Sequence, residues 1–283
     1  MSAFVKQHVV LGYYILVFAI SWGAILVVVG PGGFLSMTGT SENFALVGLA
    51  ALLGPSMAGV IMTGIVEGRP GFRDLLSRLR RWRVGVRWYA VALLTDPLLM
   101  IATIFALSFI WPAFVPGILT ADDKTSLLIA GITTGLMVPV FEELGWTGFV
   151  TPHLRCRYRV LATGIIMGLL WGAWHLPLFA GSTASAGEIP PALYLGVMLF
   201  SWLVPYRVLM VQVYDRTGSL LVAMLMHMPI VVSQYLLRPE GISGEATFTS
   251  LLVYGAMLWV AVAVLALATD TGGGGGGLRR MRA

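Results

Sequence analysis

The sequence predicts an all-α integral membrane protein built as a bundle of about eight transmembrane helices. Hydrophobic residues make up 58% of its 283 residues and charged residues only 11%, whereas a soluble domain carries roughly 25% charged residues. The mean hydropathy is +0.87. In lipid, only a helix or a closed barrel satisfies its own backbone hydrogen bonds, and apolar runs of this length favour helices.

Apolar segments long enough to cross a bilayer are found at residues 9–30, 44–66, 88–111, 125–150, 160–180, 191–213, 217–237 and 247–269. We expect one polytopic transmembrane domain over residues 1–271, with its chemically interesting part at about 125–237. Residues 272–283 are rich in glycine and arginine and predict a flexible basic tail. The N-terminal apolar run lacks a small-residue cleavage pattern, which favours a retained first span over a signal peptide.

Arginine is concentrated in three clusters, which predict the orientation. The clusters are "EGRPGFRDLLSRLRRWRVGVRW" with Arg69, Arg73, Arg78, Arg80, Arg81, Arg83 and Arg87, "HLRCRYR" with Arg155, Arg157 and Arg159, and the final "LRRMRA". Eight alternating spans place all three on one side, and such clusters favour the cytoplasmic side. We therefore predict that both termini are cytoplasmic, that the acidic loop "TADDK" lies outside, and that the membrane is a bacterial plasma membrane.

The first cluster also has the pattern of an amphipathic helix. Leu75, Leu76 and Leu79 recur at helical spacing opposite several of the arginines. This predicts a short helix in the cytoplasmic headgroup region, with membrane anchoring as its simplest role. Because the basic residues are explained by orientation, we do not expect nucleic-acid binding. The single cysteine, Cys156, can form no internal disulfide and fits no metal-binding spacing.

Ionisable residues inside apolar segments are costly and mark candidate functional sites. Glu142 and Glu143 lie in the fourth segment, within "FEELGWTGF". His175 lies in the fifth segment, within "LLWGAWHLPLF", and His227 lies in the seventh, within "LLVAMLMHMPI". These four side chains are the candidate site.

The two glutamates are adjacent, so on a helix they point about 100° apart. We expect one of them to face the site and the other to brace it. Trp146 and Thr147 follow four residues after Glu142 and Glu143 and therefore share their respective faces.

A carboxylate and two imidazoles from three helices are sufficient for hydrolysis. The carboxylate can deprotonate a water molecule, and a histidine can stabilise the oxyanion that forms. Two alternatives stay open. His, His and Glu is also a zinc ligand set, although no HExxH pattern is present. Each histidine taken alone fits an interhelical hydrogen bond, and Trp171 and Trp174 fit packing roles.

The pattern resembles the CAAX-protease and bacteriocin-processing family, the Abi or type II CAAX prenyl endopeptidase-like group of intramembrane glutamate proteases. The residues that carry the resemblance are "EELGWT" at 142–147, Trp171 four residues before His175, and His227. The likeness covers about residues 125–237. Two positions depart from the family motifs: Thr147 stands where an arginine is expected, and Val231 stands where a polar residue follows the last histidine. Gln234, two turns beyond His227, is a candidate substitute for that polar residue.

The resemblance implies Glu142 as the base that activates water and Glu143 as its support. It also implies that His175 and His227 position the water and stabilise the oxyanion, without a metal or other cofactor. We therefore predict a membrane-embedded endopeptidase that hydrolyses peptide bonds of a membrane-associated or lipid-modified substrate. A water-filled cavity should reach the site from the cytoplasmic side.

Two other functions are kept as alternatives. The departures at Thr147 and Val231 favour a non-catalytic immunity or scaffold protein that retains the protease fold. Buried carboxylates are also typical of proton-coupled transporters, although no internal repeat is evident.

Overall fold

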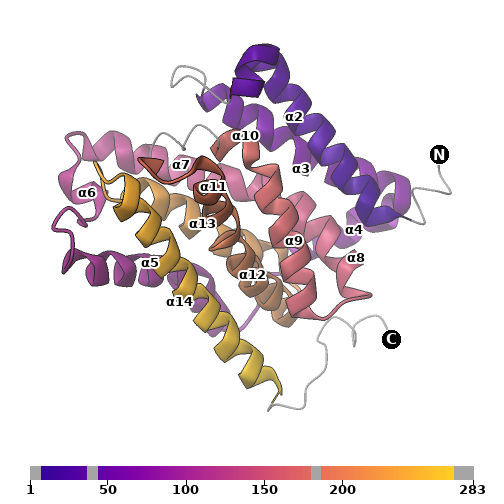
Figure 1. Ribbon diagram of the computed structural model, residues 1–283. Helices are drawn as coiled ribbons and strands as arrows, with labels where there is room; N and C mark the ends of the chain where they lie inside the picture. Colours follow the sequence, from indigo (N-terminus) through magenta and orange to yellow (C-terminus); the bar gives the residue numbers. More distant parts are fainter. Residues whose placement is uncertain (1–7, 37–43, 180–185, 271–283) are drawn as a thin grey trace.

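The computed structural model describes residues 8–36, 44–179 and 186–270, and over these residues the chain is helical without strands. Figure 1 shows α2 and α3 side by side at one edge of the bundle and α14 at the opposite edge. The long helices are α2 (Val9–Ser36), α3 (Phe44–Val66), α5 (Val86–Ser108), α7 (Lys124–Gly145), α9 (Val160–Trp174), α12 (Leu203–Thr217), α13 (Leu220–Leu236) and α14 (Gly244–Asp270). The shorter ones are α4 (Gly68–Leu79), α6 (Gly117–Thr120), the π-helix η1 (Trp146–Val150), α8 (Thr151–Arg155), α10 (Leu176–Phe179) and α11 (Pro191–Phe200).

The prediction of an all-α integral membrane protein is confirmed. In the described ranges, six helical stretches are long and apolar enough to cross a membrane: Val9–Gly33, Ala45–Val66, Val86–Ser108, Lys124–Arg155, Pro191–Thr217 and Gly244–Leu267. The other two predicted segments correspond to α9 and α13, which are apolar but have only 15 and 17 residues. At 1.5 Å per residue these helices are about 22–26 Å long, less than the roughly 30 Å of the hydrocarbon core.

Proline residues explain where two predicted segments end or break. The segment predicted at 160–180 stops being an α-helix at Trp174, because Pro177 has no N–H to continue the ladder. The segment predicted at 191–213 is divided into α11 and α12 by a turn at Ser201 and Trp202. Pro205 lies in the first turn of α12, where a missing backbone donor is tolerated.

Two arginine clusters meet at one end of the bundle, as predicted. Arg78 of α4 donates to the carbonyl oxygen of Gly148 at 2.8 Å and to the hydroxyl of Tyr214 at 2.7 Å. At the same end, Arg155 pairs with Asp215 at 2.8 Å. The amphipathic helix expected in the first cluster is α4. The third cluster and the predicted tail at 272–283 lie outside the described residues, and the assignment of this end to the cytoplasm stays a prediction.

The acidic loop lies at the other end of α7. Asp123 caps this helix by accepting a hydrogen bond from the backbone N–H of Ser126 at 3.0 Å. Hydrogen bonds from Ser126 lower the pKa of the Asp123 carboxyl below its usual range. From this cap, α7 runs toward the arginine-rich end and carries Glu142 and Glu143 in its last turn.

A row of glycines lets α9 contact α12 backbone to backbone. A Cβ atom on Gly164 would lie 2.5 Å from the Cα of Val208, and one on Gly168 would lie 2.6 Å from the Cα of Val204. Gly172 continues the row at the same spacing of four residues. Such small-xxx-small spacing is typical of close helix contacts in membranes. The contact holds the C-terminal part of α9 against α12.

We predict that Gly168→Ala lowers the thermal unfolding temperature of the purified protein in detergent, because the new methyl group must push α9 and α12 apart. Overpacking of this kind destabilises by about 1–3 kcal/mol. Gly23→Ala is the matched control, because a Cβ atom on Gly23 of α2 meets nothing within 4 Å. Equal unfolding temperatures for both variants would contradict the proposed close contact.

Candidate active site

Glu142 and Glu143 are both buried, at 2% and 0% exposed. The two carboxylates have different hydrogen-bond partners. Glu142 Oε2 accepts hydrogen bonds from the indole N–H of Trp146 at 3.2 Å and of Trp171 at 2.7 Å. Trp146 is the residue that the sequence placed on the same helix face as Glu142. Glu142 is therefore held by two neutral donors.

Glu143 is held by charged and polar donors from three helical segments. Arg207 Nη1 lies 2.9 Å from each of its carboxylate oxygens, and Nδ1 of His227 lies 2.8 Å from Oε1. The hydroxyl of Thr147 donates to Oε2. The adjacent glutamates thus diverge as their helical spacing predicts, and Glu143 is the more strongly bound of the two.

The hydrogen bonds of the two histidines fix their tautomers. His227 contacts a carboxylate oxygen through Nδ1, and His175 contacts the carbonyl oxygen of Trp171 through Nδ1 at 2.8 Å. Both acceptors lack a proton, so in each ring Nδ1 carries the hydrogen. Nε2 is then an acceptor in the neutral ring and a donor only in the imidazolium form.

The indole ring of Trp171 connects the candidate residues. Its N–H donates to Glu142, and its ring lies edge-on to His175 and His227, with centroid distances of 5.2 Å and 5.4 Å. The guanidinium carbon of Arg207 lies 4.1 Å from the centroid of the same ring. Trp171 is therefore a structural centre of the site, beyond the packing role that we expected from the sequence. Trp174 keeps a packing role, since its N–H donates to the hydroxyl of Ser21 at 2.8 Å.

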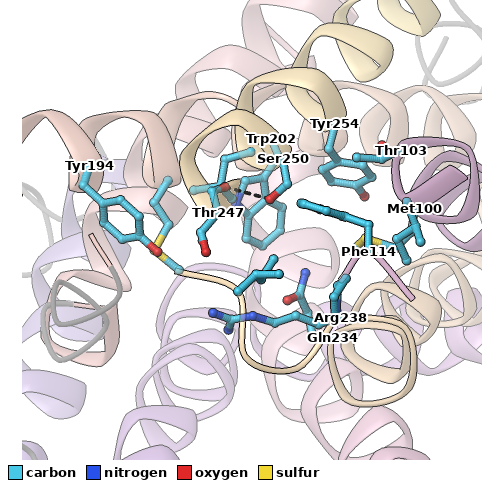
Figure 2. Close-up of a pocket in the computed structure, with 15 residues that line it drawn as sticks. Met100, Thr103, Phe114, Tyr194, Trp202, Gln234, Arg238, Thr247, Ser250 and Tyr254 are labelled. Atoms are coloured by element: carbon cyan, nitrogen blue, oxygen red, sulfur yellow. Dashed lines mark hydrogen bonds between the residues drawn. The ribbon is translucent and has the colours of Figure 1, made fainter. Parts of the chain in front are cut away.

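Gln234 is the one predicted supporting residue that lies apart from this cluster. Figure 2 shows it in the wall of a cavity that it shares with Trp202 and Arg238. The Trp202 ring lies between this cavity and the site, with its centroid 6.4 Å from that of Trp171. The substitution of Gln234 for the missing polar residue at 231 therefore gains no support from its position.

Two buried charged residues inside the predicted apolar segments were missed by the sequence analysis. Arg207, at 0% exposed, is the ion-pair partner of Glu143. Asp96 of α5, also at 0% exposed, accepts a hydrogen bond from the hydroxyl of Tyr254. Both lie inside apolar segments, in "PYRVLM" and "LLTDPLL". The rule that selected the glutamates, a charge inside a span, also applies to these two residues.

The zinc alternative gains no support from the arrangement of the side chains. In the part of the chain that the structure describes, no group of three or more His, Cys, Asp or Glu residues is placed to hold a metal ion. Nδ1 of each histidine is already bonded to a protein oxygen. The mechanism without a metal or cofactor stays a prediction.

These observations define an integral membrane protein whose buried carboxylates and imidazoles meet around one tryptophan. A family model described as "Type II CAAX prenyl endopeptidase Rce1-like" matches residues 124–232, which include every member of that cluster. The CAAX prenyl protease 2 of Methanococcus maripaludis is 24% identical to the chain over 242 residues, which cover 82% of this chain and 86% of the relative. Over these residues the chain is similar to the CAAX protease family. This likeness supports a peptidase, and hence a hydrolase, at the level of the family.

We predict that Trp171→Phe destabilises the protein more than Trp174→Phe. Both variants remove an indole N–H from α9, but one N–H binds a carboxylate and the other a hydroxyl. Hydrogen bonds to charged groups contribute about 1.5–3 kcal/mol, against about 0.5–1.5 kcal/mol for neutral pairs. Thermal unfolding in detergent measures the difference, and in a Glu142→Gln background the two effects should become similar. Equal losses in the wild-type background would show that Glu142 is not a charged acceptor.

Proposed function

We propose that the protein is an intramembrane endopeptidase in which Glu142 activates the hydrolytic water. The observation that supports this most strongly is the different binding of the two glutamates. Glu143 is neutralised by Arg207, whereas within the described residues Glu142 accepts hydrogen bonds from two neutral indole N–H groups, those of Trp146 and Trp171. A carboxylate without a paired cation in a low-dielectric site is the better proton acceptor.

In this mechanism Glu142 takes a proton from water while the water oxygen attacks the carbonyl carbon of the peptide bond. The C–N bond of the tetrahedral intermediate then breaks, and the same proton passes from Glu142 to the amine that leaves. No covalent enzyme intermediate is required. General-base catalysis of this kind contributes about 10²–10⁴-fold to the rate.

The two histidines have different roles because their Nδ1 partners differ. His227 donates to the Glu143 carboxylate through Nδ1, so Nε2 is the atom that we propose faces the oxyanion, to which it donates in the imidazolium form. His175 donates to a neutral backbone carbonyl, so its ring is suited to stay neutral and to accept a hydrogen bond from the water at Nε2.

The proposed substrate is a membrane-associated or lipid-modified peptide. The site residues lie on apolar helices, and the relative from Methanococcus maripaludis is named a prenyl protease. The arginine-rich end is proposed to face the cytoplasm of a bacterial cell, with water and the peptide entering from that side. Both termini are then cytoplasmic.

A non-catalytic immunity or scaffold function is the second candidate, and one observation favours it. Val231 packs against the hydrophobic core, where the family motif has a polar side chain. A site without that polar group has one donor fewer for an oxyanion.

We predict that Glu142→Gln lowers peptide turnover by about 10²–10⁴-fold, since the amide cannot accept a proton from water. The amide oxygen still accepts from both indoles, so the unfolding temperature should change little. The measurement is cleavage of a fluorogenic peptide in liposomes, with prenylated and unprenylated versions of the same sequence. Cleavage by Glu142→Gln at the wild-type rate would remove the proposed base. Absence of cleavage by wild type, together with full cellular protection by a Glu142→Gln/His175→Ala variant, would favour the scaffold function.

A further inference from the structure

Arg207 is a fully buried cation on α12, and it forms an ion pair with Glu143. Nη1 donates to both carboxylate oxygens at 2.9 Å, while the guanidinium carbon lies 4.1 Å from the Trp171 ring centroid. Nε and Nη2 have no hydrogen-bond partner within the described residues. A buried guanidinium is costly unless a carboxylate compensates it, so the pairing with Glu143 explains why an arginine is tolerated at this position.

The pair also determines how His227 is held. Oε1 of Glu143 accepts both from Arg207 Nη1 and from His227 Nδ1, at 2.9 Å and 2.8 Å. With the carboxylate fixed by the cation, the proton of the histidine stays on Nδ1 and Nε2 is presented on the opposite edge of the ring. Arg207 thus acts on His227 through Glu143.

The side chain at position 147 also contacts the Glu143 carboxylate. The Thr147 hydroxyl donates to Oε2, one helical turn after Glu143. An arginine at 147 would be long enough to bring a guanidinium to this carboxylate, because side chains four residues apart on a helix are neighbours. The cation that stabilises Glu143 could therefore come from either helix.

We propose that Arg207 is a positioning residue of the peptidase site, which holds Glu143 against His227 and supplies from α12 the cation that Thr147 does not supply from η1. This proposal rests on the proposed peptidase function. If the proposal holds, an arginine at either position 147 or position 207 can supply the positive charge that stabilises Glu143.

The test compares Arg207→Met, Arg207→Lys and the double variant Thr147→Arg/Arg207→Met with wild type, using the full-length protein and the liposome cleavage assay. Loss of a hydrogen bond to a charged group corresponds to about 10–100-fold. We expect Arg207→Met to lower kcat by this factor with KM unchanged. Arg207→Lys should retain part of the activity, and the double variant should recover most of it.

Arg155→Met is the matched control, because Arg155 is also paired with a buried aspartate, at 2.8 Å, but at the arginine-rich end of the bundle. It should lower the unfolding temperature and leave the kcat of the folded protein unchanged. The proposal is overturned if Arg207→Met keeps the wild-type kcat, or if the double variant folds like wild type but is no more active than Arg207→Met. If wild type cleaves no peptide, the peptidase function itself fails, and a double-mutant cycle of unfolding temperatures between Arg207 and Glu143 then measures their coupling alone.

A separate observation concerns the cavity in Figure 2, which is lined by residues of α5, α11, α13 and α14. Much of its lining is apolar, and Arg238 is the charged residue in its wall. The apolar lining includes Met100, Ile104, Phe114, Met198, Ile242 and Leu251. The cavity volume is about 60 Å³, which is enough for a small polar group and a few methylene groups but not for a whole hydrocarbon chain.

Two buried hydroxyl groups at this cavity lack a protein partner. Tyr194 is 0% exposed and Thr247 is 4% exposed, and neither hydroxyl has a hydrogen-bond partner within the described residues. Figure 2 shows both side chains turned toward the space in which the Arg238 side chain lies. Unsatisfied buried polar groups are rare in native proteins and indicate a bound water, ion or ligand.

We infer that this cavity binds the head group of an amphipathic anion, with its acidic group at Arg238 and the two hydroxyls and the first carbons of its hydrocarbon chain among the apolar residues. The cation and the hydroxyl donors match an acidic head group. The methionine, phenylalanine and leucine side chains match a flexible chain. A free fatty acid and an anionic membrane lipid share this chemistry.

The test uses quenching of tryptophan fluorescence, because Trp202 lines the cavity. Full-length protein in phosphatidylcholine nanodiscs is titrated with a brominated fatty acid in one arm, and brominated phosphatidylglycerol is included in the nanodisc in the other. We expect saturable quenching in at least one arm, which identifies the source. Trp202→Phe should lose this component of the quenching.

Arg238→Gln and Thr247→Val should each weaken binding of the fatty acid, and Arg238→Gln should do so by ~10-fold or more. The methyl ester of the fatty acid carries no charge. Its affinity for the wild-type protein should be as low as the affinity of the acid for Arg238→Gln. Arg157→Gln is the control for a lost surface charge, since Arg157 is exposed in the second arginine cluster. Equal quenching by acid and ester, or equal affinity of Arg238→Gln and wild type, would overturn the assignment of an anionic ligand.

Discussion

The site depends on the ion pair between Glu143 and Arg207. An isolated charge inside a membrane protein is very unfavourable, so neither residue could be buried at 0% exposure without the other. The pair joins α7 to α12, and the hydrogen bond from His227 adds α13 to the same carboxylate. Three helices are thus brought into register by one carboxylate, and the neighbouring Glu142 is left on the other face of α7 with neutral donors.

The second requirement is the close approach of α9 to α12, which places Trp171 between the residues of the site. The glycines at 164 and 168 allow the two backbones to touch. Because of this contact, the Trp171 ring lies within 4.1 Å of the guanidinium carbon of Arg207 while its N–H reaches Glu142. The glycine packing between α9 and α12 therefore also positions the Trp171 N–H that binds Glu142.

The sequence predicts the fold class and most of the site because both follow from local rules. Hydropathy locates the helices, and helical spacing separates Glu142 from Glu143 and places Trp146 and Thr147 beside them. The rest depends on contacts between helices that the sequence does not specify. The pairing of Arg207 with a glutamate 64 residues away and the position of Gln234 in a separate cavity are set by how α12 and α13 pack. The shortened α9 and the break before α12 could have been predicted from Pro177 and Pro205.

The two departures from the family motifs do not have equal weight for function. Thr147 removes a cation beside Glu143, but Arg207 brings a charge to the same carboxylate that His227 binds, so on the proposal above this departure is compatible with a working site. Val231 is different, because it packs against the core and brings no donor of its own. In the proposed mechanism an oxyanion would then depend on the Nε2–H of His227, which only the imidazolium form carries. The ion pair with Arg207 must accordingly fix the Glu143 carboxylate without displacing His227, and Oε1 does accept from both Arg207 Nη1 and His227 Nδ1, while Oε2 accepts from the same Nη1.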